Sequence, residues 1–433
     1  MKFRNAVSAA VLAAAIALGG PALASPGSDL LDRIAVDFVH MTLEAGEREP
    51  GYVDAYYGPK EWEASAKLAP RPVSVLRKEA DRLQMLLAKV PDKDLDADQR
   101  RRKTFLRGQI KAAQTRLAMI AGDKFSFEDE AEGLFGVRPA LKPLKSYDPI
   151  LARIDKLVPG KGDLAARVDA FQNKYVIPTD KVEAVMKAGI AACKAKTEQH
   201  IELPAGERFD LEFVTKKPWS GYNWYKGDAH SLIQINTDLP IYISRALDLG
   251  CHEGYPGHHV LNALLEQKLT KGKGWIEFSV YPLFSPQSFI AEGSANFGID
   301  LAFPGKAKTE FERDKLYPLA GLDPKTAEAY GELQEAKAAL SSSGNTVAAL
   351  YLSGKMTKEQ AVQALMMYSL YSRGGAEKRV AFIETYRSYV INYNIGQDMV
   401  RDHVHRAGKS EDARWKAMER VISEPTTPAD LRK

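Results

Sequence analysis

A cluster of three histidines and one glutamate, broken by a proline and two glycines, limits how the middle of this chain can fold. The cluster reads His252-Glu253-Gly254-Tyr255-Pro256-Gly257-His258-His259. The apolar pattern of a helix continues on both sides, over 243–249 and 260–265. Pro256 has no amide hydrogen and its ring clashes with the preceding helical turn, while glycine tolerates a bulged backbone. The sequence therefore predicts a helix with a local bulge at this point.

Neutral imidazole and carboxylate groups are what a catalytic zinc ion requires, with three protein ligands and one open position. The usual helical arrangement places two histidines four residues apart, but here the fourth residue after His252 is Pro256. In a straight helix, His258 would lie ~120° from His252 around the axis, and His259 ~10 Å along it. A bulge of about two residues would bring His258 beside His252, and a larger one would bring His259 there instead. Either pair could share one metal ion.

Glu253 adjoins this pair and could act as a general base that takes a proton from water. The alternative is that the bulge faces solvent and that these side chains have no catalytic or metal-binding role. The apolar pattern on both sides of the cluster favours a functional site. A third ligand is expected from a second helix, where Glu292 is the best candidate. Taken by itself Glu292 is weak support, because the helix dipole also favours glutamate near a helix start.

Helical periodicity dominates the rest of the chain. Segments 73–90 and 99–120 have the pattern of a helical hairpin, and Thr357 to Gln360 has the pattern of a capping box. Alternating, β-rich sequence is confined to 209–236. We therefore predict a mainly α fold with a small antiparallel sheet immediately before the active-site helix.

A chain of 433 residues can bury one large core or two moderate ones. We find no repeats and no long linker, so one mainly helical domain over 25–433 is the simplest interpretation. A division into an N-terminal helical lobe (25–177) and a catalytic lobe (178–433) is the alternative. The net charge of +4 is small and evenly spread, which argues against a nucleic-acid partner.

The first 24 residues have the features of a signal peptide. Lys2 and Arg4 precede an apolar, alanine-rich stretch, and Ala22-Leu23-Ala24 matches the small-x-small pattern of a cleavage site. We expect cleavage after Ala24 and a periplasmic or secreted protein. No later stretch is apolar enough to span a membrane.

The chain has two cysteines, Cys193 and Cys251. They lack the paired spacing of a thiolate zinc site, so the zinc ligands must be histidine and carboxylate. One disulfide between them would be compatible with an oxidising compartment, but the sequence does not decide whether they pair.

The histidine string, followed by Ala291-Glu292-Gly293, resembles the DUF885 family of bacterial exported proteins. Members of that family combine an H-E-x-x-P-G-H-H segment with a later E-G helix. The similarity extends over most of the chain after the leader. Its further matches are Val53-Asp54-Ala55-Tyr56-Tyr57-Gly58-Pro59, Leu134-Phe135-Gly136-Val137-Arg138-Pro139 and Gly354-Lys355-Met356-Thr357-Lys358-Glu359-Gln360-Ala361.

The resemblance implies a helical architecture similar to that of zinc peptidases. It implies His252, His258 and Glu292 as the metal ligands, and Glu253 as the base. The chain departs from the family pattern at Ser294, where tryptophan is usual. It also has Ile299 where an acidic residue is expected.

Two further elements near the cluster could take part in the chemistry. Tyr393 resembles a Tyr-x-x-Gly element of the family and could donate a hydrogen bond to a developing oxyanion, although core packing is the alternative. Ser231–Asn236 could be an edge strand that pairs with an extended peptide, or simply part of a structural hairpin. His403 and His405 point to different sides of a helix and are interpreted as surface or packing residues.

The sequence thus predicts an exported zinc-dependent hydrolase, with a metallopeptidase as the leading hypothesis and a peptide as its substrate. An enzyme of the same mechanism could instead cleave a non-peptide amide or ester. A catalytically silent binding protein is the third hypothesis, and the intact Glu253 argues against it. No cofactor besides Zn²⁺ is predicted, and the oligomeric state is not defined by the sequence.

Overall fold

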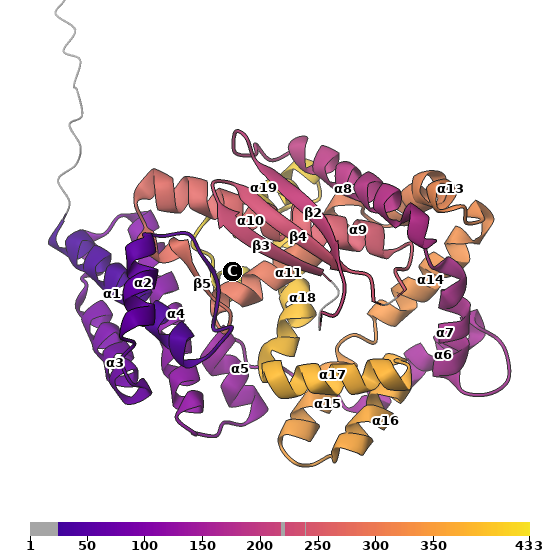
Figure 1. Cartoon of the computed structure of the whole chain (residues 1–433), viewed down its shortest axis with the longest axis horizontal. Coiled ribbons are helices and arrows are strands. Elements are labelled where there is room, and N and C mark those ends of the chain that lie inside the picture. The colour runs from indigo at the N-terminus through magenta and orange to yellow at the C-terminus, as the bar shows by residue number, and fades with distance from the viewer. Residues whose placement is uncertain (1–24, 218–220, 239) are drawn as a thin grey trace, which may run out of the picture.

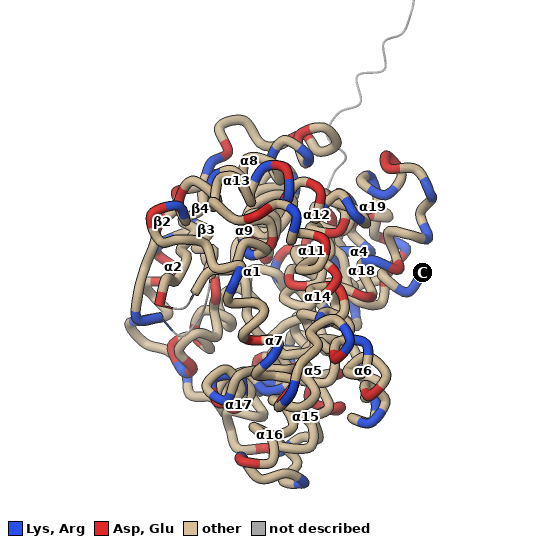
Figure 2. Tube along the Cα trace, turned by 90° about the vertical axis from the view of Figure 1, so that its right-hand side faces the viewer, with Lys and Arg blue, Asp and Glu red and all other residues tan. Residues whose placement is uncertain are grey.

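The computed structural model describes residues 25–217, 221–238 and 240–433 (Figure 1). The predicted signal peptide, 1–24, lies outside the described residues. Among the helices that are described, none combines the length and the apolar character needed to cross a membrane. Basic and acidic residues are interspersed along the face drawn in Figure 2, in keeping with the small net charge.

The fold is mainly helical with small sheets, as predicted. The N-terminal helices lie on the left of Figure 1, except for α6 and α7 on the right. Their bounds are α1 (Pro26–Arg48), α2 (Lys60–Leu68), α3 (Val73–Lys89), α4 (Ala97–Ile120), α5 (Phe127–Phe135), α6 (Asp148–Leu157) and α7 (Leu164–Gln172). The pair α3 and α4 is the predicted helical hairpin. Asp96 and Gln99 form a capping box that fixes the start of α4.

The middle of the chain carries the histidine cluster and runs through the centre of the molecule. Its elements are α8 (Val182–Glu198), β2 (Arg208–Val214), β3 (Gly221–Gly227), β4 (His230–Asn236), α9 (Arg245–Leu249), α10 (His258–Leu265), β5 (Val280–Pro282) and α11 (Pro286–Ala302). Helix α11 packs closely on α18 (Ile395–Ala407), because Gly293 and Gly396 leave room for the two backbones to touch.

The C-terminal helices complete the molecule, with α15, α16 and α17 grouped at the bottom of Figure 1. Their bounds are α12 (Ala307–Phe311), α13 (Tyr317–Ala320), α14 (Ala327–Ala338), α15 (Ser343–Leu352), α16 (Lys358–Ser369), α17 (Arg373–Tyr386) and α19 (Glu411–Ser423). The predicted capping box is present, since Thr357 accepts from the Gln360 amide and Gln360 accepts from the Thr357 amide.

The three-stranded sheet has the order β2-β4-β3, and the expectation that all of its strands are antiparallel was wrong for one pair. Of the two roles left open for Ser231–Asn236, the hairpin is present and the edge position is not. Strands β3 and β4 form an antiparallel hairpin, but β2 and β4 run parallel. Along the chain β2 and β3 run in opposite directions, and β4 runs in the same direction as β2. Because β4 lies between β2 and β3 in the sheet, it is parallel to β2 and antiparallel to β3. Consequently Ser231–Asn236 lies in the middle strand, and the edge strands are β2 and β3.

A second, two-stranded sheet was missed by the sequence interpretation. β1 (Val53–Tyr56) pairs antiparallel with β5, which lies more than 200 residues later in the chain. The alternating pattern of a strand normally extends over roughly 4–8 residues, and β1, with four residues, is at the lower limit of that range while β5, with three, is below it. This sheet brings Asp54 toward the middle of the molecule.

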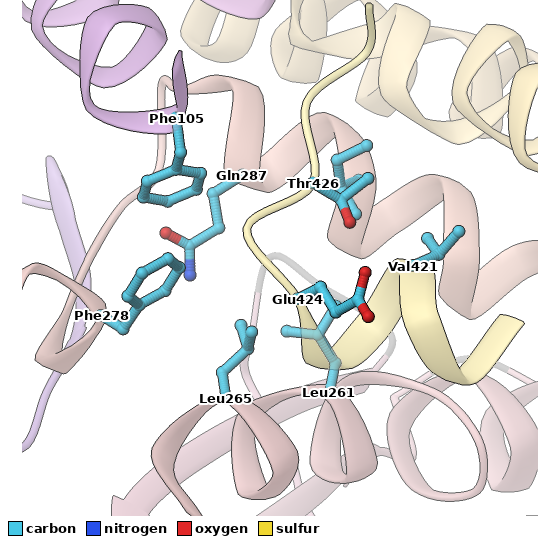
Figure 3. Close-up of a pocket in the computed structure, with 9 residues that line it drawn as sticks. Phe105, Leu261, Leu265, Phe278, Gln287, Val421, Glu424 and Thr426 are labelled. Atoms are coloured by element: carbon cyan, nitrogen blue, oxygen red, sulfur yellow. The ribbon is translucent and has the colours of Figure 1, made fainter. Parts of the chain in front are cut away.

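The largest cluster of buried apolar residues draws on both expected lobes, from Leu31 in α1 to Leu431 near the C-terminus. The one-domain organisation stays a prediction. A cavity of about 10 Å³ lies inside this core. Figure 3 shows the side chains that line it, which include residues of α4, α10, α11 and α19. That volume is about the size of one water molecule, so the cavity is too small for a substrate.

Cys193 of α8 and Cys251 form a disulfide, which answers the question that the sequence left open. Their Cα atoms are 5.3 Å apart, both residues are fully buried, and the bridge joins positions 58 residues apart. The disulfide ties α8 to the segment that carries His252.

Removal of this disulfide is expected to lower the free energy of unfolding by about 4 kcal/mol, because a long loop gains conformational entropy in the unfolded chain. The measurement is chemical denaturation of wild type and of the Cys193→Ala/Cys251→Ala variant. Wild type treated with reductant should move toward the variant, and the variant should not respond to reductant. An unchanged midpoint in the variant would contradict this expectation.

Candidate metal centre

The predicted bulge is present between α9 and α10. A π-helical turn at Gly250–Gly254 follows α9, and a cis peptide bond joins Tyr255 to Pro256. A Cβ atom on Gly257 would lie 1.8 Å from the His252 carbonyl oxygen, so only glycine fits there. The chain folds back through this turn and places His258 next to His252.

The structure brings together the three residues that the sequence predicted as metal ligands. The Nε2 atoms of His252 and His258 are 3.2 Å apart. Glu292 Oε2, from α11, lies 3.5 Å from the first and 3.7 Å from the second. The ligand atoms of the three residues all lie within 4.8 Å of one another, so the group could hold a metal ion.

The donor set and its hydrogen bonding fit a zinc ion. Glu292 Oε1 accepts a hydrogen bond from the Tyr389 hydroxyl at 2.9 Å. Glu292 Oε2 is buried and accepts no hydrogen bond from any residue in the described part of the chain. A buried carboxylate oxygen without a partner is costly, and a cation between it and the two imidazoles would remove that cost. Two imidazoles and a carboxylate are the ligands of several catalytic zinc sites.

The electrostatics of the cluster also favour a cation. Burial alone would lower the pKa of His258, but the carboxylates of Glu292 and Glu253 outweigh it and raise the pKa to about 9. Burial dominates at His252 and lowers its pKa. Burial would raise the pKa of Glu292, but the two imidazoles lower it. The group therefore attracts positive charge into its centre.

Asn296 orients one of the imidazoles, a role that the sequence interpretation missed. Its Oδ1 lies 3.0 Å from Nδ1 of His252, and its Nδ2 donates to the Tyr393 carbonyl at 2.9 Å. The contact fixes His252 with Nε2 toward the other ligands, as partners of metal-binding histidines usually do. Asn296 follows Glu292 by four residues, so both lie on one face of α11. That spacing was the signal in the sequence that could have identified Asn296 as part of the site.

Glu253 lies beside the three ligands. Its Oε1 is 4.0 Å from Nε2 of His252, and the residue is 6% exposed. Its backbone carbonyl accepts a hydrogen bond from Asn223, and a Cβ atom on Gly221 would lie 3.2 Å from its Oε1. Strand β3 therefore packs directly against this carboxylate. This is a suitable place for a general base, which must reach a water molecule at the metal.

Tyr389 and Tyr393 pack against each other, with ring centroids 5.8 Å apart. Burial raises the pKa of Tyr393 well above its ordinary value, and the charges of Glu292 and Glu253 raise it further. The phenol is therefore a neutral hydrogen-bond donor in the neighbourhood of both carboxylates. Its catalytic role stays a prediction. Tyr389, which contacts Glu292, was not singled out from the sequence because aromatic residues usually pack in the core.

His259, the alternative ligand, is held away from the cluster. Its Nδ1 lies 2.8 Å from the Ser231 hydroxyl and its Nε2 lies 2.8 Å from Oε2 of Glu207. The residue is 1% exposed and links the sheet to α10. His405, on α18, contacts Phe297 edge-on, in agreement with a packing role.

Glu207 should make stability depend on pH. Burial alone would raise its pKa, but hydrogen bonds from His259, Lys194 and Tyr255 lower it to about 2 from an ordinary 4.5. Because the folded pKa is depressed, the ionised carboxylate stabilises the fold fully above pH 4.5. This stabilisation, about 3 kcal/mol, is lost as pH falls from there toward the folded pKa. The measurement is chemical denaturation of wild type and Glu207→Gln between pH 7 and pH 3. The difference between their free energies of unfolding should become smaller as the pH falls, and a difference that does not change with pH would contradict this expectation.

Asp54 is a further residue that the sequence interpretation did not assign. It comes from β1 and accepts a hydrogen bond from the Tyr222 hydroxyl on β3. Burial raises its pKa to about 6, and its charge acts on His258, Glu292 and Glu253. The side chain therefore lies near the candidate metal centre, although it is not one of the ligand group.

Comparisons with known proteins place the fold. No family model matches the sequence, and no curated protein matches it. The crystal structure of a candidate lipoprotein from Colwellia psychrerythraea matches with a TM-score of 0.52 and 15% identity, over 94% of this chain and 75% of that one. This chain shares the fold of that protein.

Two further solved structures are more distant. A candidate lipoprotein of unknown function from Shewanella oneidensis has a TM-score of 0.48 and 15% identity, over 86% of this chain and 75% of that one. An M32 carboxypeptidase from Deinococcus radiodurans R1 has a TM-score of 0.36 and 14% identity, over 93% of each chain.

Proposed function

We propose that this chain is an exported zinc-dependent hydrolase that cleaves peptide bonds and belongs with the DUF885 proteins. One observation carries the proposal: two imidazole nitrogens and a buried carboxylate oxygen without a hydrogen bond converge within 4.8 Å, with Glu253 beside them. Three protein ligands leave a position open for water and substrate, as in catalytic zinc sites.

The residues of the chain divide the chemistry between them. His252, His258 and Glu292 would hold the zinc ion, which supplies a charge that acidifies water and polarises a substrate carbonyl. Glu253 takes the proton from the attacking water and returns it to the leaving amine. Tyr393 donates a hydrogen bond to the oxygen that gains negative charge. Asn296 keeps the His252 ring in its binding orientation.

A peptide substrate is favoured by the sheet next to Glu253. β3 is an edge strand of the three-stranded sheet, and Gly221 at its start packs against the Glu253 carboxylate. An extended peptide that paired with an edge strand in this place would lie along the candidate centre. We therefore propose that β3, and not Ser231–Asn236, is the edge strand that pairs with an extended peptide.

Digestion of a peptide library by zinc-loaded protein, with and without chelator and read by mass spectrometry, tests the proposal. We expect chelator-sensitive cleavage, restored by added zinc, and the cleaved positions will report endo- or exopeptidase preference. A parallel panel of simple esters and non-peptide amides covers the alternative substrate classes. Hydrolysis of that panel without peptide cleavage would contradict a peptidase. Absence of all hydrolysis would contradict an enzyme.

Export is supported by two independent features. The leader has the composition of a signal peptide, and the Cys193–Cys251 disulfide is of a kind that persists in oxidising compartments. Fractionation of bacteria that express the full chain should recover the mature form, beginning after Ala24, outside the cytoplasm. Recovery of uncleaved chain in the cytoplasm would contradict export.

A further inference from the structure

The charges around the candidate metal centre do not balance. A zinc ion held by two neutral imidazoles brings two positive charges, and the carboxylates of Glu292 and Glu253 neutralise both. Asp54 is a third carboxylate in the same region, and its charge acts on both of them and on His258. A buried charge needs a partner of opposite sign or a strong set of hydrogen bonds.

Asp54 has no ion pair with any basic side chain in the residues that the structure describes. Its hydrogen bond comes from the Tyr222 hydroxyl, which is neutral. Two arginines influence other members of the site: Arg245 acts on His252 and Arg379 on Tyr393. Neither forms an ion pair with Asp54. The Asp54 carboxylate is therefore left without a direct partner of opposite charge among the described residues.

Asp54 is partly exposed and lies where β1 contacts β3. Tyr222, its partner, directly follows Gly221, which packs against the Glu253 carboxylate. Asp54 also lines a cavity of about 250 Å³ between α1, α2 and β1. The other charged residues of that cavity are Glu47 and Glu63, both acidic, and Glu63 is paired with Lys67. The cavity is large enough for several water molecules or a long side chain.

We propose that Asp54 is a specificity residue that binds a protonated amine of the substrate close to the scissile bond. The inference rests on the proposed peptidase function and narrows its substrates to peptides that carry an ammonium group there. An ammonium would donate to the free acceptor positions of Asp54 and restore neutrality to the site. Two sources have this chemistry, a free N-terminus and a basic side chain.

The test begins with wild-type protein loaded with zinc and a peptide that it cleaves. Four versions are compared: unmodified, N-acetylated, with norleucine in place of each lysine, and with both changes. We expect kcat/KM to fall about 10–100-fold when the recognised amine is removed, as for loss of a hydrogen bond to a charged group. A fall on acetylation identifies the N-terminal ammonium, and a fall on norleucine substitution identifies the side chain.

Two variants separate recognition from a structural role. Asp54→Asn should cleave amine-bearing and amine-free peptides at similar rates, so that the wild-type ratio of kcat/KM between them is lost. Tyr222→Phe keeps the carboxylate and should keep the preference. Equal loss on all four peptides in both variants would overturn the inference in favour of a structural tie between β1 and β3.

The wild-type measurement stands by itself if Asp54→Asn does not fold. Equal cleavage of all four peptides by wild type overturns this inference and leaves the peptidase proposal intact. Failure of zinc-loaded wild type to cleave any peptide of the library overturns both.

Discussion

Replacing Glu253 with glutamine is expected to lower kcat by roughly 10²–10⁴-fold, the usual contribution of a general base. Glutamine has almost the same shape but cannot take a proton, and Glu253 is not one of the three grouped ligands. The zinc content should therefore stay at that of wild type. Steady-state kinetics on a peptide from the library, together with metal analysis of the same sample, measure both quantities.

Glu212→Gln is the matched control, because Glu212 lies on the exposed side of β2 and hydrogen-bonds to Gln234. It should change neither rate nor zinc content. Undiminished turnover in Glu253→Gln would remove Glu253 from the mechanism. Loss of zinc from Glu253→Gln would instead mean that this carboxylate is a ligand.

The second large effect is expected on metal affinity from His258→Ala. Residues that only orient a ligand typically change metal affinity 10–100-fold, and removal of a ligand should exceed that range. The neighbouring variant His259→Ala should keep wild-type affinity, because its ring faces Ser231 and Glu207. Competition titrations with a zinc-binding dye compare the two variants.

His259→Ala should act mainly on stability and not on metal affinity. His259→Ala leaves the Ser231 hydroxyl without its partner and removes one of the three side chains that hydrogen-bond to Glu207, so it should lower the free energy of unfolding by about 2–4 kcal/mol. His258→Ala removes an imidazole that lowers the pKa of the buried Glu292 carboxylate, so it should also destabilise the metal-free protein, and zinc affinity is the quantity that separates the two variants. A large loss of zinc affinity in His259→Ala, with wild-type affinity in His258→Ala, would contradict the assignment.

The backbone of the centre could be predicted from the sequence because its causes are local. Pro256 removes a helical hydrogen bond, and Gly257 permits an approach to the His252 carbonyl that any side chain would block. Together they produce a bulge that brings His258 next to His252, although a regular helix would place the two side chains on different faces. Helix geometry alone left His259 as an alternative metal ligand to His258. In the structure the His259 ring contacts Ser231 and Glu207 instead.

Other features depend on contacts between distant segments, which a single sequence does not encode visibly. β1 pairs with β5 across the chain and thereby places Asp54 beside the site. Tyr389, which precedes α18, donates a hydrogen bond to Glu292 of α11, 97 residues earlier in the chain. The parallel pair β2 and β4 follows from insertion of the third strand, which the alternating pattern cannot reveal.

Anomalous diffraction at the zinc absorption edge, from crystals of the protein loaded with one equivalent of zinc, tests the shared metal site most directly. We predict one strong peak about 2.0–2.2 Å from Nε2 of His252, Nε2 of His258 and a carboxylate oxygen of Glu292. A peak elsewhere in the molecule, or none in protein that has been shown to be folded and exposed to zinc, would contradict it.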